Sequence, residues 1–251
     1  MITKTEIDKL AETYENIDFI KDDPVRVPNR FTEKKDIEIA GFIASLVAYG
    51  RREVFLKKLD TLFEIAQNEP LNFILNFEPK ILGDFNYRFG KPDDFAQIFT
   101  ILRNLYSKSG GLEELFKYGY QNPIEGNMFI PVTDFFYAQA TNNDSQGFKF
   151  MIPDARKGSA MKRMCMYLRW MVRKGPVDFG LWDFMKPSEL LIPLDTHVAR
   201  LSREMGLLTR NANDFKSVLE ITENLRKFDP EDPAKYDFAM FGYGVTHKTA
   251  K

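Results

Sequence analysis

The chain has 251 residues, of which 44% are hydrophobic and 28% charged, as in an ordinary globular protein with one large or two small domains. Its longest apolar run, residues 39–49, is too short to cross a bilayer, and its N-terminus lacks the apolar core of a signal peptide, so we expect a cytoplasmic protein with no membrane partner. One cysteine, Cys165, excludes an intrachain disulfide and a self-contained iron–sulfur cluster, and with only two histidines, His197 and His247, we expect no metal and no cofactor.

Apolar residues recur at helical spacing along the chain, and no run alternates as a strand would. The sequence therefore predicts an all-α protein. In the first half we expect helices over residues 5–14, 36–49, 54–66, 93–106, 112–118 and 129–140, a short apolar segment at 71–76, and loops at 24–28, 83–92, 121–127 and 141–147.

The second half contains a helix predicted over residues 160–174, followed by two breakers, Gly175-Pro176 and Lys186-Pro187. Further helices are expected over 196–205, 214–228 and 234–241.

The segment 149–174 carries eight Lys and Arg residues against one acid, Asp154, so its formal charge is +7 in a chain whose total is −1. On a helical wheel Lys162, Arg169 and Arg173 fall on one narrow stripe, opposite an apolar face. Nucleic acid is the commonest polyanion to match such a field. A stripe of one sign also fits a solvated face, or one neutralised by acids from elsewhere in the chain.

The start of this helix predicts a second phosphate contact. Ser159 follows Lys157-Gly158 and is a plausible N-cap, which would leave backbone N–H groups pointing outward beside Arg156. The residues expected to contact DNA in this part of the chain are Arg156, Ser159, Lys162, Arg163, Arg169, Arg173 and Lys174.

Asp195 precedes the helix at 196–205, and an aspartate in that position is first of all an N-cap. The same geometry also suits a catalytic carboxylate, because a fixed, ionised side chain can stabilise positive charge on a sugar ring or accept a proton from water. His197, without a partner in the sequence, is expected to be structural.

These residues carry a resemblance. Pro193-Leu194-Asp195-Thr196-His197-Val198 resembles the Val-Asp-Thr-His segment of the helix-hairpin-helix DNA glycosylase superfamily, and residues 236–242 look like the helix that closes its core. The segment Gly41–Arg52 is similar to the helix and loop that reach into the DNA. Residues 158–173 are closer still to an uncharacterised bacterial family within that superfamily.

The resemblance implies a glycosylase-like fold of two helical subdomains around a cleft, with a basic hairpin-like segment at 149–174 and a C-terminal part at 190–245 carrying the catalytic Asp195. It makes Lys157, at the turn, the nominee for the nucleophilic lysine. Tyr49, Arg51 and Arg52 are nominated as a wedge into the duplex, and residues 87–89 as a second one.

The function expected from these features is DNA repair, with duplex DNA containing a damaged or abasic nucleotide as partner. The protein would hydrolyse or lyse the N-glycosidic bond of a flipped base. Two alternatives are open at this point: a non-catalytic nucleic-acid-binding protein with the same fold, and a basic face that docks an acidic protein.

Overall fold

The computed structural model of the protein describes residues 2–246, and the side chains of residues 2–244; His247 lies outside the described residues. Over this range the chain is all-α, with twelve α-helices, seven short 3-10 helices and no β-sheet, only isolated bridges. No described helix is long and apolar enough to cross a membrane. The α-helices are α1 (Lys4–Tyr14), α2 (Lys34–Val47), α3 (Arg52–Ile65), α4 (Pro70–Leu75), α5 (Pro92–Lys108), α6 (Leu112–Gln121), α7 (Phe129–Gln139), α8 (Gln146–Met151), α9 (Lys162–Val172), α10 (Thr196–Glu204), α11 (Phe215–Arg226) and α12 (Tyr236–Thr246).

Most of the predicted helices are confirmed, with ends that differ from the predicted ones by a few residues. Helix α1 begins with a capping box in which Thr3 and Glu6 bond each other's backbone, and it starts one residue earlier than expected. Helix α8 begins in the last two residues of the loop predicted at 141–147 and runs into the basic segment, where we predicted no helix before residue 160. With six residues it is too short for its apolar positions to show a helical period.

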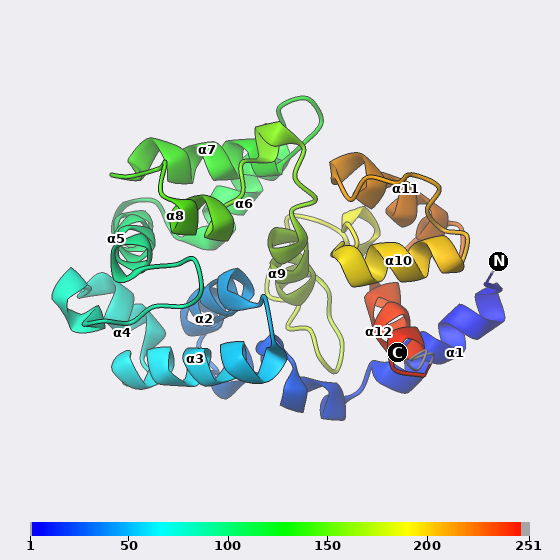
Figure 1. Ribbon diagram of the computed structural model, residues 1–251, viewed down its shortest axis with the longest axis horizontal. Coiled ribbons are helices and arrows are strands. Elements are labelled where there is room, and N and C mark those ends of the chain that lie inside the picture. Colours follow the sequence, from blue (N-terminus) through cyan, green and yellow to red (C-terminus); the bar gives the residue numbers. More distant parts are fainter. Residues whose placement is uncertain (1, 247–251) are drawn as a thin grey trace. The chain divides into compact units, whose positions relative to one another are not determined.

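The described chain divides into two compact units, labelled by helix in Figure 1. The first unit takes in the chain up to Lys21 and from Gly158 on, so it contains α1 and α9 to α12. The second runs from Asp22 to Lys157 and contains α2 to α8. The boundary between the units falls inside the basic segment 149–174.

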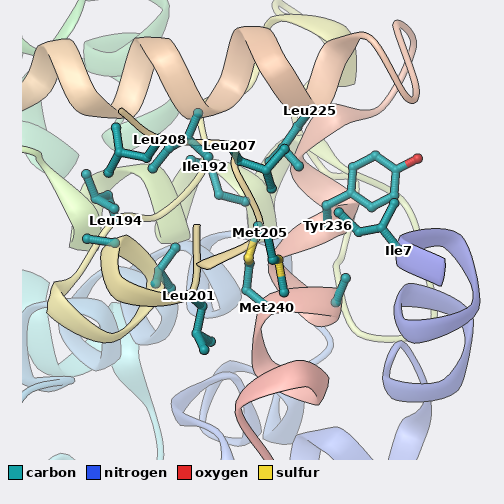
Figure 2. Packing of buried hydrophobic residues seen from close by; sticks show 14 of the residues in the cluster. Ile7, Ile192, Leu194, Leu201, Met205, Leu207, Leu208, Leu225, Tyr236 and Met240 are labelled. Carbon is teal, nitrogen blue, oxygen red and sulfur yellow. The ribbon is translucent and has the colours of Figure 1, made fainter. Parts of the chain in front are cut away.

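The first unit has a core of buried apolar side chains from α1, α10, α11 and α12 and from the segments that flank α10, which Figure 2 shows at close range. Glycines let α12 come close to its neighbours. A Cβ atom at Gly242 would lie 2.1 Å from the Tyr14 ring of α1, and one at Gly244 would lie 2.3 Å from Nε2 of His197 on α10. The rings of Tyr14 and His197 thus pack directly on the backbone of α12.

The second unit is organised around α2, which is buried along almost its whole length. Such a helix must be covered on several sides, which explains its nearly continuous apolar sequence. Helix α4 packs on α2 and on α5, and α6 and α7 lie side by side (Figure 1). A cluster of edge-to-face phenylalanines, Phe73, Phe77 and Phe99, joins α4 to α5.

Candidate functional site

The stripe of cations on α9 does not face solvent along its length, so its predicted exposure is wrong for two of three members. Arg169 is 2% exposed and Arg173 5% exposed. Every residue of α9 from Met164 to Val172 is buried. The prediction failed because the acids that receive these arginines come from distant parts of the sequence.

Each buried arginine has several partners within the first unit. Arg169 pairs with Asp178, Nε to Oδ1 3.3 Å, and with Asp237. Its guanidinium also lies 4.4 Å from the ring centre of Phe238. These contacts place Arg169 in the interior as a packing residue of the unit.

Arg173 meets three carboxylates. Its Nη2 lies 2.9 Å from Glu15 Oε2, its Nη1 3.0 Å from Asp178 Oδ2, and its Nε 2.7 Å from Asp232 Oδ2. The pKa values of Asp178 and of Asp232 are raised, chiefly by burial and also by the charge of Glu15, although the neighbouring arginines act to lower them. The C-terminal half of α9 is thus neutralised by acids of the same chain.

The same holds for most of the basic segment. Of its eight cations, six lie within 4 Å of a carboxylate, three of them within the second unit: Lys149 with Asp144, Arg156 with Asp134, and Lys157 with Asp154. Arg163 is half-buried and Lys174 is exposed. Most of the charge of the segment is thus paired with acids of the same chain, and all but one of these pairs use acids from outside the segment.

Ser159 does not cap α9, which corrects the second predicted phosphate contact. The helix begins at Lys162, and its N-cap, Met161, has a left-handed backbone with φ of 50° and makes no side-chain cap bond. Ser159 instead forms a backbone bridge with Asp214, beside a bond from Phe215 N–H to Gly158 O of 2.9 Å. Residues 158 and 159 therefore pair with the start of α11 and not with the first turn of α9.

Asp195 caps α10, as the sequence predicts. Its Oδ1 accepts the backbone N–H groups of His197 and Val198, both at 2.9 Å. The two bonds fix the carboxylate at the start of the helix, where the helix dipole also favours a negative charge.

The other oxygen of Asp195 carries the contact that makes this a candidate site. Lys162 Nζ, at the first residue of α9, lies 3.0 Å from Asp195 Oδ2. The side chains are 34% and 36% exposed, so both are open to a ligand. Two helix starts thus bring an amine and a carboxylate together inside the first unit.

The electrostatics keep this carboxylate charged. Burial by itself would raise the pKa of Asp195, but the charge of Lys162 and the bonds from Val198 and His197 outweigh it, and the pKa lies below its ordinary value of 3.8. Asp195 is therefore an anion at neutral pH. An anion of fixed orientation beside an amine can stabilise a developing cation or take up a proton.

His197 is close in sequence to Asp195 and is exposed. Its ring packs over Gly244 of α12, and Arg200 Nη2 lies 3.5 Å from its Nδ1. Its structural role stays a prediction.

The lysine and arginine nominated at the turn belong to the second unit. Lys157 Nζ lies 3.7 Å from Asp154 and its side chain is 76% exposed. Arg156 forms a two-pronged pair with Asp134, Nε to Oδ1 3.0 Å and Nη2 to Oδ2 2.5 Å. The hydrogen bond with Asp134, and then its charge, raise the pKa of Arg156. Because Lys162 lies against Asp195, the nominee for the catalytic lysine moves from Lys157 to Lys162.

The two predicted wedge loops meet within the second unit. Tyr49 donates its hydroxyl to Tyr87 O at 3.0 Å, and the Tyr87 hydroxyl bonds Tyr49 O. Tyr49 is thereby half-buried and tied to the other loop, while Arg51 and Arg52 are exposed at the start of α3. The exposed side chains of the second loop are Arg88 and Phe89.

Sequence reasoning missed two features of these sites. It placed Lys162 only among the phosphate contacts. At the start of α9, Lys162 instead reaches Asp195 at the start of α10. It also ranked residues 87–89 behind Tyr49, although the tip is better exposed. Among the described residues, no group of His, Cys, Asp and Glu side chains is placed to hold a metal ion.

Comparison with known proteins adds one finding. A family model described as "Protein of unknown function (DUF2400)" matches residues 23–246, which is most of the chain. No curated protein matches the chain. No solved structure matches it either.

Proposed function

From the premise that the chain belongs to this family of unknown function, we propose that the protein binds DNA and acts on the sugar of a damaged or abasic nucleotide through Lys162 and Asp195. The observation that carries the proposal is the contact of 3.0 Å between Lys162 Nζ and Asp195 Oδ2, with both side chains part-exposed. The helix-hairpin-helix glycosylases that residues 193–198 resemble suggest the same substrate class.

In this proposal Asp195 stabilises the positive charge that develops on the sugar as the bond from C1′ to the base breaks. Its Oδ1 is held by two N–H groups, so little reorganisation is needed when the charge appears. Its low pKa keeps it ionised.

Lys162 is the proton donor and then the nucleophile. The electron pair of the C1′–N bond leaves with the base, which takes a proton from the Lys162 ammonium. The neutral amine then bonds to C1′, so an ammonium and a nucleoside become a free base and a charged C1′–N adduct, and charge is conserved. Water activated by Asp195 in place of the amine would give hydrolysis without an adduct.

The test is base release from duplexes containing damaged bases, together with strand cleavage at abasic sites, with Asp195→Asn as the variant. Asparagine is as good an N-cap as aspartate, so this change removes the charge and keeps the cap. We expect a loss of at least about 100-fold in rate, the size typical of losing a group that stabilises a transition-state charge.

The chain offers a matched control. Asp214 caps α11 through the Ser217 N–H at 2.9 Å and pairs with Arg210 at 2.7 Å, the same arrangement at another helix. Asp214→Asn should leave the rate unchanged. If the wild type binds duplex DNA but releases no base and cleaves no abasic strand, the protein is a non-catalytic nucleic-acid-binding protein, and the proposed chemistry is wrong.

A further inference from the structure

The second unit contains a cavity of about 730 Å³ between α5 and the loop that leads from α7 to α8. This volume is in the range of sites for small organic molecules. Its lining is polar and rich in carboxamides, with Gln97 from α5 and Gln139, Asn142 and Gln146 from the loop side.

The loop is fixed to α5 by buried polar groups, so the cavity has a defined frame. Asp94, 2% exposed, accepts the Lys91 N–H at 2.9 Å and the hydroxyl of Ser145. Gln97, 8% exposed, exchanges two bonds with the backbone of Asn142, at 3.3 and 3.2 Å. A buried network satisfied in this way specifies one arrangement of the loop.

Gly147 completes the frame. A Cβ atom there would lie 2.2 Å from Asp94 Oδ2 and 2.5 Å from Phe89 O, so any side chain would separate α8 from α5. The close packing at this glycine holds the two walls together.

The charges of the lining disfavour an anionic ligand. Two carboxylates, Asp93 and Asp94, face one amine, Lys91. A phosphate inside the cavity would meet a net negative field. A neutral ring with hydrogen-bonding edges fits better, because carboxamides donate and accept at once.

At the rim an aromatic side chain is presented by a tight turn. Tyr87 and Gly90 exchange two backbone bonds of 2.9 Å, which leaves Arg88 and Phe89 exposed at the tip. Arg88 has a φ of 52°, as does Glu125 in the corresponding turn at Ile124–Asn127. The 87–90 turn differs from the other by carrying an aromatic side chain at its tip.

Phe89 is 39% exposed, lines the cavity and rests against Phe150, with ring centres 4.8 Å apart. The Arg88 guanidinium lies 5.9 Å from the Phe89 ring centre and 5.8 Å from that of Tyr49. A supported aromatic face beside a cation is the usual platform for a stacked base of a single strand.

We propose that this cavity binds a nucleobase, which stacks on Phe89 and is hydrogen-bonded by the carboxamides of the loop, with its phosphate held outside near Arg88. The site lies wholly in the second unit. It does not use Lys162 or Asp195, so it would be a second contact with nucleic acid beyond the proposed function.

The test uses the full chain labelled with ¹⁵N and titrated with adenosine, guanosine, cytidine or thymidine. We expect at least one nucleoside to give saturable shifts confined to α5, residues 139–147 and the 87–90 turn. Phe89→Ala should weaken this binding about tenfold, since one base stacked on an aromatic ring is worth that much. Tyr118→Ala, which removes an aromatic ring that is 58% exposed on α6, is the matched control and should change nothing.

Asp195→Asn should bind nucleosides as the wild type does, which separates this proposal from the proposed function. The nucleobase site is overturned if no nucleoside gives saturable shifts, if the shifts map elsewhere, or if Phe89→Ala binds as tightly as the wild type. It is equally overturned if maltose, a neutral polyol of similar size, binds as tightly as the nucleosides. Loss of base release in Asp195→Asn bears on the proposed function and does not affect the nucleobase site.

Discussion

The two ends of helix α9 carry the same kind of side chain on the same stripe and have opposite surroundings. At the first residue, Lys162 is part-exposed and meets the single carboxylate Asp195. Two and three turns later, Arg169 and Arg173 are buried. Several carboxylates surround them, Glu15 and Asp178 among these. The comparison teaches that a run of charge on a helix predicts polar partners but does not say whether they are solvent, ligand or the chain itself.

The largest effect is expected at the buried end. Arg173→Met should destabilise the protein by about 3–5 kcal/mol, because it leaves buried carboxylates without their cation. Lys174→Met, one residue on and exposed, should change the free energy of unfolding by less than about 0.5 kcal/mol. Urea unfolding of the two variants measures both values. Equal effects would mean that the two ends of the stripe do not differ as described.

A smaller effect is expected at the open end. Asp195→Ala removes the cap of α10 and should cost about 1 kcal/mol, whereas Asp195→Asn keeps a capping side chain and should cost less. The loss of the surface pair with Lys162 adds at most about 1 kcal/mol to either variant. Thermal unfolding compares them, and an asparagine variant as unstable as the alanine one would show that the charge, and not the cap, stabilises the helix.

The pH dependence should have opposite signs at the two ends. The pKa of Asp195 is lowered by folding, so its contribution to stability is present above its ordinary value of 3.8 and is lost as the pH falls through the folded pKa. The pKa of Asp232 is raised by burial, so its contribution is fully present at low pH and is lost as the pH rises through the folded pKa.

Relative to wild type, Asp195→Asn should therefore cost less stability at pH 3 than at pH 7, and Asp232→Asn should cost more at pH 3 than at pH 7. The free energy of unfolding is measured for the wild type and for each variant at pH 3 and at pH 7. The change in the cost of each substitution between the two pH values gives one slope for Asp195 and one for Asp232. Slopes of the same sign would contradict the assignment of burial and pairing to the two ends of α9.

Much of the fold could be predicted because it depends on local signals. Helical spacing gave nearly all the long helices, and Asp195 was read correctly as a cap because its bonds reach only two and three residues along the chain. Helix α8 was missed because six residues show too little periodicity.

The rest depends on contacts between distant residues. Glu15 and Arg173 are far apart in sequence and pair only because α1 returns to the C-terminal part of the chain. The same holds for Lys162 and Asp195, which come from two helices. Nothing in the local sequence distinguishes an arginine that will find such acids from one that faces solvent.

The central claim is that Lys162 and Asp195 form a reactive pair, and borohydride trapping on a duplex with an abasic site tests it most directly. Reduction of a Schiff base would fix the lysine to the DNA, and peptide mapping would identify it. We predict an adduct at Lys162 that is absent in Lys162→Ala and unchanged in Lys157→Ala. An adduct at Lys157, or one that persists in Lys162→Ala, would contradict the account.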